Sequence, residues 1–396
     1  MTNNLLFSTH HFLSLLLNSC GSNSLGEGEQ AFTQQEKKFV HTLFLTEYLW
    51  ADQVTSNIDY STFSSPQSLL NELRVTPPDK WSFAMTAHEY DNFVNQKTEG
   101  FGFGYKDNFI VFLVRINSPV YGKLFRGDQI IQIDGEEVSQ SLIKSLSTQL
   151  NKTSIFTVLR NNQFIEVALK PKEYTFKVTQ SKVLTQGSKK IGYLRYDSFT
   201  GTSVAEFEKA FTTFKNTNID ELVIDLRYNG GGSIVVASTL LENITNAYPG
   251  QRQGYLDWNT HYKNRNKSFY FTDEPDTNDL NMKRVFFLVT KGSASASELV
   301  ISALKPYLGK TNVITIGTNT HGKNVGMSGK TYGSHYYFIV NFFVRNNTNE
   351  TTGFEGIIPT CSAIDDIHHT MGDPNETMLS TALYYIQNDK CPQERI

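Results

Sequence analysis

A serine and a downstream lysine form the pair of residues in this sequence best suited to nucleophilic chemistry. Ser295 stands between Ala294 and Ala296, and Lys323 follows Gly322. A serine hydroxyl becomes a strong nucleophile when a neighbouring base takes its proton. Lysine acts as that base only in its neutral form, which burial favours by lowering the pKa. The sequence therefore predicts a Ser295/Lys323 dyad that works without histidine.

The residues around Ser295 predict the elements that position it. Residues 284–290 form a short run of β-branched and aromatic residues typical of a strand, and residues 298–304 have the composition of a buried helix. Ser295 is thus expected at a strand-to-helix junction, where the unpaired N–H groups of a helix start are available to an oxyanion. The alternative is a serine that only caps the helix.

A second predicted strand, residues 221–226, leads into Gly230, Gly231 and Gly232. Three glycines after a buried strand indicate a backbone that takes unusual angles or approaches a ligand closely. One of their N–H groups could donate to a developing negative charge, and the alternative is a flexible turn. Asp225 and Arg227 are expected to be structural, pairing at the end of the strand.

In combination these motifs resemble the C-terminal processing peptidases, also called tail-specific proteases. The matching stretches are Asp-Leu-Arg-x-Asn-x-Gly-Gly, Gly-Ser-Ala-Ser-Ala-Ser-Glu and Gly-Lys, and the resemblance covers nearly all of the chain after its N-terminal segment. It implies that Ser295 is the nucleophile and Lys323 the general base. It also implies an oxyanion hole made by the N–H of Ala296 and that of Gly231 or Gly232, with no cofactor and no metal.

The lysine motif departs from the family pattern at one position. Many members carry a glutamine four residues after the lysine, whereas this chain has Met327 there. Methionine is at best a weak hydrogen-bond acceptor. Either another group orients Lys323, or packing holds it.

An upstream module looks like a PDZ domain and covers residues 97–172. It begins with the alternating glycine/aromatic stretch 100–105 and contains a Gly-Asp-x-Ile-x-x-Ile-Asp-Gly pattern. Such domains capture a chain end by strand addition, with backbone N–H groups holding the terminal carboxylate. Gly102, Phe103 and Gly104 are the predicted cradle. The alternative is a small β-domain that only braces its neighbour.

These motifs divide the chain into four predicted regions. Residues 1–29 are a signal-like, lipoprotein-like or disordered tail, and residues 30–96 an N-terminal helical region with helices over 35–50 and 65–73. The PDZ-like module follows, and residues 173–396 form the peptidase core with a C-terminal helix. Strands and helices alternate in the core, which predicts an α/β fold. The resemblance implies that this core is crotonase- or ClpP-like.

The three cysteines bear on cellular location. Residues 13–21 resemble the end of a bacterial lipoprotein signal, with Cys20 as the lipidated residue, although the first Lys or Arg is Lys37 and the usual positive stretch is missing. Cys361 and Cys391 either form a disulfide, which persists outside the cytosol, or remain two buried thiols. The expectation is an exported, lipid-anchored protein of the periplasm or cell envelope.

Composition excludes other classes of function. The 396 residues carry a net charge of −3, with a pI near 6.3, and give no reason to expect nucleic acid as a partner. Asp365, Asp366, His368 and His369 could suggest a metal, but a solvated turn is the expectation because no other ligands converge.

The predicted function is that of a serine endopeptidase that selects protein substrates by their free C-termini. Two alternatives stay open. One is a non-catalytic protein that binds peptides in the PDZ-like groove. The other is a penicillin-recognising acylase, because Ser302 and Lys305 match the Ser-x-x-Lys pattern.

Overall fold

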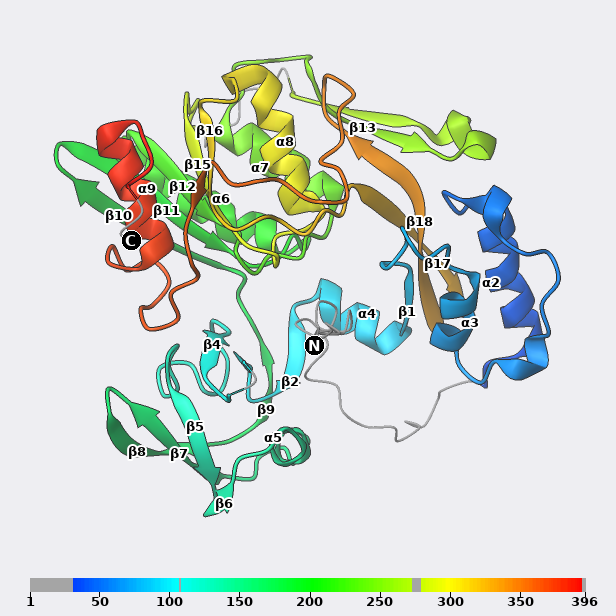
Figure 1. Cartoon of the computed structure of the whole chain (residues 1–396), viewed down its shortest axis with the longest axis horizontal. Coiled ribbons are helices and arrows are strands. Elements are labelled where there is room, and N and C mark those ends of the chain that lie inside the picture. The colour runs from blue at the N-terminus through cyan, green and yellow to red at the C-terminus, as the bar shows by residue number, and fades with distance from the viewer. Residues whose placement is uncertain (1–30, 107, 273–278, 394–396) are drawn as a thin grey trace, which may run out of the picture. The chain divides into compact units, whose positions relative to one another are not determined.

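A computed structural model describes residues 31–106, 108–272 and 279–393 (Figure 1). The predicted lipidation site, Cys20, lies outside these residues. The described chain folds into two compact units. The core unit contains residues 31–95, 178–365 and 377–393. The inserted unit contains residues 96–177 and also 366–376, a segment that the sequence assigned to the core. None of the helices in the described ranges is long and apolar enough to cross a membrane.

A six-stranded sheet forms the centre of the core unit, in the order β10-β11-β12-β15-β16-β19. β10 and β11 are antiparallel, and the other neighbours are parallel. Every residue of β12, β15 and β16 is buried, as expected for parallel strands covered on both faces. The strands span Thr179–Gln186 (β10), Lys189–Tyr196 (β11), Glu221–Asp225 (β12), Val285–Val289 (β15), Val313–Gly317 (β16) and Cys361–Ser362 (β19).

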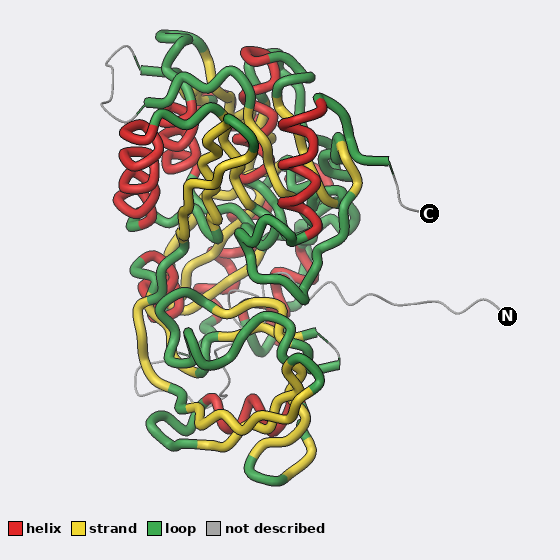
Figure 2. Tube along the Cα trace, turned by 90° about the vertical axis from the view of Figure 1, so that its left-hand side faces the viewer, coloured by secondary structure: helices red, strands yellow, loops and turns green. Residues whose placement is uncertain are grey.

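Helices cover both faces of this sheet (Figure 2). α9 packs its apolar side on one face, against β12, β15 and β16, while the opposite face is covered by α6, α7 and α8 (Figure 1). This arrangement follows the predicted alternation of strands and helices. The helices span Ser203–Thr217 (α6), Ile234–Ile244 (α7), Ala296–Leu308 (α8) and Thr377–Asn388 (α9).

A second sheet of the core unit contains strands from both ends of the sequence. Its order is β1-β18-β13-β14, and β17 also pairs with β18. The N-terminal region, predicted as a helical region, therefore contributes β1 as well as helices. The strands span Phe83–Thr86 (β1), Arg252–Trp258 (β13), Lys267–Tyr270 (β14), Val325–Tyr332 (β17) and His335–Arg345 (β18).

The N-terminal helices pack on this second sheet. α2 and α3 bury Val40, Phe44, Leu69 and Leu70 against β17 and β18. α3 begins after Ser65, whose side chain accepts a hydrogen bond from the backbone N–H of Ser68, as is typical of a serine N-cap. The helices of this region and the remaining short helix of the core span Gln34–Thr46 (α2), Ala51–Gln53 (η2), Tyr60–Thr62 (η3), Pro66–Leu73 (α3), Ala87–Val94 (α4) and Thr260–Arg265 (η4).

The inserted unit is built mainly from short antiparallel strands around one apolar core. β3 pairs with β4, and no other strand of the described chain pairs with β3. The segment 366–376 joins this unit through Arg126, whose side chain donates to the backbone oxygens of Asp366 and His369. The elements span Lys97–Gly100 (β2), Phe103–Tyr105 (β3), Val111–Val114 (β4), Gln129–Ile133 (β5), Glu136–Glu137 (β6), Gln140–Ser147 (α5), Ser154–Arg160 (β7), Gln163–Leu169 (β8) and Lys172–Thr175 (β9).

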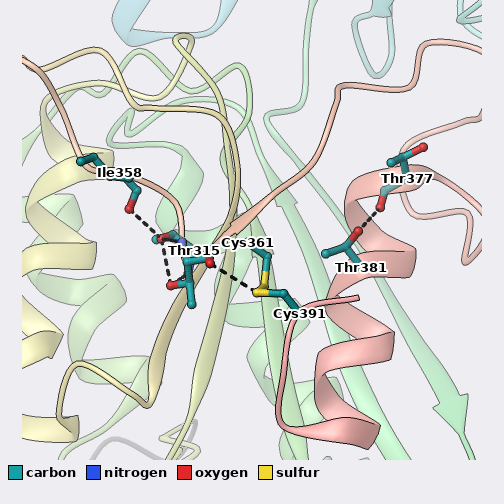
Figure 3. Close-up of a disulfide and its surroundings, with 7 residues drawn as sticks. Thr315, Ile358, Cys361, Thr377, Thr381 and Cys391 are labelled. Carbon is teal, nitrogen blue, oxygen red and sulfur yellow. Dashed lines mark hydrogen bonds between the residues drawn. A yellow bond between two sulfur atoms is a disulfide. The ribbon is translucent and has the colours of Figure 1, made fainter. Parts of the chain in front are cut away.

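A disulfide joins Cys361 in β19 to Cys391, which follows α9 (Figure 3). The two Cα atoms are 5.6 Å apart, and the bridge closes a sequence separation of 30 residues. The sequence left open whether these cysteines form a disulfide or remain two thiols, and the structure has the disulfide. It fixes the end of the C-terminal helix to the edge strand of the six-stranded sheet.

Candidate active site

Ser295 occupies the junction between β15 and α8 in an unusual backbone conformation. It is the N-cap residue of α8, with φ 56° and ψ −111°. Positive φ is uncommon for a residue with a side chain, and the strain persists only where the surroundings impose it. In α/β-hydrolases, a serine on a sharp strand-to-helix turn of this kind presents its hydroxyl to the substrate.

The three serines of this stretch have different surroundings. Ser293 and Ser297 are fully buried, and their hydroxyls donate to the backbone oxygens of Leu226 and Asn229 at 2.7 and 2.9 Å. Ser295 remains partly exposed. The outer two serines thus tie the junction to the end of β12, and the middle serine is the one available to a substrate.

Glu298 connects two loops. One is the serine junction, residues 290–295 between β15 and α8, and the other is the lysine loop, residues 318–324 between β16 and β17. One of its carboxylate oxygens, Oε2, accepts hydrogen bonds from the backbone N–H groups of both Ser295 and Lys323, each at 2.9 Å. Its other oxygen accepts from Gly322 N–H at 2.8 Å and from the Thr320 hydroxyl at 2.6 Å. Two amides that share one acceptor atom must lie side by side. The structure therefore brings Ser295 and Lys323 together.

Sequence reasoning missed this role of Glu298. A glutamate three residues after a capping serine is a common helix-start pattern, in which the carboxylate accepts from the N-cap N–H. That pattern predicts the bond to Ser295. The bonds to Gly322 and Lys323 depend on contacts between residues far apart in the sequence, which the local pattern does not reveal.

Lys323 has the electrostatic surroundings of a base. Although part of its side chain remains accessible, burial lowers its pKa to about 8, and the charges of Asp79 and Glu298 partly oppose that effect. With such a pKa, about a tenth of the lysine is neutral at pH 7. Its Nζ lies 4.0 Å from the sulfur of Met327, a weak acceptor.

The glycine-rich turn after β12 contacts the serine junction directly. We call residues Asn229–Gly232 the core turn. A Cβ atom on Gly231, where φ is 102°, would lie 2.8 Å from the Cβ of Ser295 and 3.0 Å from the nitrogen of Ala296. Only glycine fits such a close approach at positive φ. Glycine is therefore required at position 231 by packing against Ser295, which a loose turn would not need.

The two glycines predicted as oxyanion donors differ in their hydrogen bonds. The N–H of Gly231 donates to Oδ1 of Asn229 at 2.9 Å, so it is already engaged. The backbone N–H groups of Gly232 and Ala296 donate to no group of the described chain. These two amides are consequently the better candidates for binding an oxyanion next to Ser295.

Asp225 and Arg227 form a buried ion pair behind the core turn. Arg227 Nη2 lies 2.8 Å from Asp225 Oδ2, and both side chains are fully buried. Arg227 Nη1 also contacts Asp365 at 3.0 Å, and the Tyr193 hydroxyl donates to Asp225. These contacts fix the end of β12, from which the core turn starts, which agrees with the structural role expected for this pair.

Two of the residues that could have suggested a metal site, Asp365 and Asp366, instead contact other side chains of the protein. Asp365 pairs with Arg227, and Asp366 accepts from the His369 ring at 2.6 Å inside the inserted unit. Within residues 31–106, 108–272 and 279–393, no three His, Cys, Asp or Glu side chains gather as they would around a metal ion.

The N-terminal region contributes residues near Lys323 that the sequence did not indicate. The indole N–H of Trp81 donates to His321 Nε2 at 3.0 Å, and the backbone N–H of His321 donates to Ser293. Burial, followed by the charges of Lys80, Lys323 and Lys291, lowers the pKa of His321 to about 4. His321 is therefore a neutral, hydrogen-bonded ring at pH 7 and not a competing base.

A small apolar hollow is lined by residues of α7 and α8. Its volume is about 10 Å³, roughly the room of one water molecule. Leu299 in its wall lies one helical turn after Ser295, and Ile234 follows the core turn by two residues. Its other lining residues are mostly apolar and come from α7, β13, β14 and β18. The hollow is thus within one helical turn of the serine but is too small for a side chain.

The Ser-x-x-Lys alternative does not have this geometry. Ser302 lies inside α8, where its hydroxyl donates to the backbone oxygen of Leu299 at 3.1 Å. A nucleophile of that class stands where substrate reaches it, whereas Ser302 belongs to the body of a helix.

Comparison with known proteins places the chain in a family. The model of Peptidase family S41 matches residues 190–362, and the model of the Peptidase S41 N-terminal domain matches residues 35–83. The first range contains the core turn, Ser295 and Lys323. The second contains Asp79 and Trp81.

Curated relatives carry related names. The chain is 25% identical over 261 residues to "Carboxy-terminal processing protease CtpB" of Bacillus subtilis, which covers 60% of this chain and 50% of the relative. It is 25% identical over 198 residues to "Tail-specific protease" of Haemophilus influenzae, with 50% and 25% covered. It is 31% identical over 140 residues to a chloroplastic carboxyl-terminal-processing peptidase of Arabidopsis thaliana, with 34% and 24% covered. The chain thus spans about half or less of the length of these relatives.

A solved structure has a similar fold. A Bacteroides fragilis protein described as an S41 protease superposes with a TM-score of 0.78 at 22% identity, over 89% of this chain and 97% of the other. This likeness concerns the fold alone. The two family models, together with the curated relatives, show that the chain belongs to peptidase family S41.

Proposed function

We propose that the protein is a serine endopeptidase in which Ser295 is the nucleophile and Lys323 the general base. The observation that carries the proposal is the Glu298 carboxylate, whose single oxygen accepts from the amides of both residues. The strained backbone of Ser295 and the lowered pKa of Lys323 support it. Membership of a peptidase family points to the same chemistry.

The proposed reaction is acyl transfer. Neutral Lys323 takes the proton of the Ser295 hydroxyl as its oxygen attacks the substrate carbonyl, and the N–H groups of Ala296 and Gly232 stabilise the oxyanion. The C–N bond then breaks, and the Lys323 ammonium protonates the leaving amine. Lys323 next activates a water molecule, which hydrolyses the ester and restores the free serine.

The inserted unit is proposed to be PDZ-like and to select substrates by their C-termini. β3 leaves one edge free in the described chain, which suits strand addition by an extended peptide. Gly102, Phe103 and Gly104 lie at the start of this strand and would provide the amides that hold the terminal carboxylate. A crotonase- or ClpP-like core, export and lipid anchorage through Cys20 belong to the same proposal.

The test combines active-site labelling with cleavage. Wild type, Ser295→Ala and Lys323→Ala would be treated with a fluorophosphonate probe and with an unstructured protein that has a free apolar C-terminus. Ser302→Ala is the matched control, because it removes a hydroxyl from the same helix away from the site. Labelling and cleavage should be lost in the first two variants and kept in the control.

The alternative of a non-catalytic peptide-binding protein predicts another result. Wild type would bind the free C-terminal peptide but would neither label nor cleave. Cleavage retained by a pure Ser295→Ala sample would contradict the assignment of the nucleophile.

A further inference from the structure

A short segment before β1 packs on both sides of the lysine loop. We call residues Asp79–Ser82 the clamp segment. Trp81 donates its indole N–H to His321, two residues before Lys323. Ser82 accepts a hydrogen bond from the N–H of Val340 in β18 at 3.1 Å. The clamp segment therefore contacts the loop that carries Lys323 and also the strand behind it.

β18, the strand that Ser82 contacts, is connected to Lys323 through its neighbour β17. Val340 in β18 is the register partner of Met327 in β17, and the Met327 sulfur is 4.0 Å from Lys323 Nζ. The Lys323 side chain thus points towards the part of the sheet on which the clamp segment packs. Met327 offers it no strong hydrogen bond.

Asp79 is a buried carboxylate with all its hydrogen bonds satisfied. It is fully inaccessible to solvent, and each of its oxygens accepts two hydrogen bonds. The donors are the Tyr48 hydroxyl, the Ser82 hydroxyl and the backbone N–H groups of Trp81 and Ser82. Burial and the charge of Asp79 raise the pKa of Tyr48, so Tyr48 stays a donor.

The negative charge of Asp79 has no cation of the described chain within ion-pair distance. The ion pairs in the described part of the core unit all involve other carboxylates. Its charge nevertheless acts on Lys323, whose pKa it raises together with Glu298 against the effect of burial. Asp79 and Glu298 are the two carboxylates that act on Lys323, and His321 beside it is neutral at pH 7.

We propose that Asp79 is a positioning residue for Lys323 and supplies the counter-charge for the ammonium that forms when Ser295 loses its proton. This inference rests on the proposed function. The role is similar to that of the aspartate in a Ser-His-Asp triad, which stabilises the protonated base without taking the proton itself. It also accounts for a lysine base that works beside Met327, where no strong hydrogen-bonding partner is present.

The test measures the rate at which the fluorophosphonate probe labels the full-length protein, from pH 6 to pH 10. In wild type the rate should rise with pH to a midpoint near 8, because only neutral Lys323 activates Ser295. Asp79→Asn keeps the shape and removes the charge. Its midpoint should fall by about one pH unit, and its plateau rate about tenfold, because an uncompensated lysine is a weaker base.

Two variants control for a merely structural role. Tyr48→Phe removes one donor to Asp79 but keeps the charge, so its midpoint should stay within about 0.3 units of wild type. Asp79→Glu restores the charge and should move the midpoint back. Thermal melting curves would show that each variant is folded. An Asp79→Asn protein that is folded and slower, with an unmoved midpoint, would overturn the proposal.

A variant outside the clamp segment keeps the proposal testable if Asp79→Asn does not fold. Met327→Gln introduces a hydrogen-bonding side chain beside Lys323. If Asp79 already stabilises the ammonium, the labelling rate should change by less than about threefold, whereas an increase of about tenfold or more would show that Lys323 lacks support in wild type. Absence of labelling in wild type would contradict the proposed function itself, and so the two failures are distinguishable.

Discussion

Two glycine-rich turns, one in each unit, have different surroundings. The core turn packs against the Cβ of Ser295 and the backbone nitrogen of Ala296. The inserted-unit turn, residues 100–104, is held at Gly102, where φ is 84° and an added Cβ would collide with the Tyr174 hydroxyl and the Cβ of Ser118. In the proposed function, both turns present amides to an anion, and they differ in the residues that lie next to those amides.

Beside the core turn lie a strained serine and a lysine with a lowered pKa, whereas in the described residues no such pair lies beside the inserted-unit turn. The proposal therefore assigns the first turn to an anion that forms transiently during a reaction and the second to a carboxylate that is already present. If it holds, glycine-rich composition predicts an anion site, and the neighbouring residues decide between catalysis and recognition.

The sharpest test of this contrast is Gly231→Ala in the core turn. The added Cβ would press on Ser295 and the nitrogen of Ala296 at positive φ. We expect kcat to fall by about a hundredfold or more, the range for disturbing an oxyanion site. Gly230→Ala is the matched control, because a Cβ there meets no atom within 4 Å. Equal kcat values for the two variants would remove the distinction between these glycines.

The corresponding change in the inserted unit is Gly102→Ala. Disturbing the proposed carboxylate cradle should raise KM about tenfold for a substrate with a free C-terminus and leave kcat nearly unchanged, because binding and chemistry are separated. An amidated substrate should show no such difference. Gly122→Ala, also at positive φ but with no neighbour within 4 Å, controls for backbone strain. A large loss of kcat in Gly102→Ala would contradict a pure binding role.

The two turns should also differ in their response to pH. Because the Lys323 pKa is lowered to about 8, kcat/KM should fall about tenfold per unit as pH decreases below that value. The affinity of a free C-terminal peptide, measured with the Ser295→Ala protein, should be nearly constant between pH 6 and pH 9. A parallel loss of affinity would show that the pH dependence arises in recognition.

The smallest effect on activity is expected from the disulfide. Replacement of both Cys361 and Cys391 by alanine should lower the free energy of unfolding by about 3 kcal/mol, as for a bridge that closes a loop of this length. Neither turn contains a residue of the bridge, so kcat at 25 °C should change by less than about twofold. Chemical denaturation and initial rates measured on the same samples would show whether stability and activity separate.

The serine junction and the core turn could be predicted because their signals are local. β12 and β15 are continuous apolar runs, and small residues or glycines follow each of them. Short segments of this kind determine both the strand and the turn after it. The predicted strands and helices of the core were found close to their expected limits.

The remaining features depend on contacts between distant residues. Asp79 and Trp81 follow two prolines and carry no local pattern that indicates a role, although Trp81 reaches His321, 240 residues further along. β1 lies in a region that is otherwise helical, and it is stabilised by pairing with β18. The segment 366–376 has no local pattern that would assign it to the inserted unit. The periodicity of apolar residues along the chain does not indicate which distant segments contact one another.

The bridge between Cys361 and Cys391 has a consequence for a protein exposed to proteolysis. The chain between these cysteines leaves the core unit, contributes residues 366–376 to the inserted unit and returns as α9. A single backbone cut anywhere inside this ring leaves the two fragments covalently joined, with α9 still attached to the edge strand. A nick there would release no fragment until the bridge was reduced.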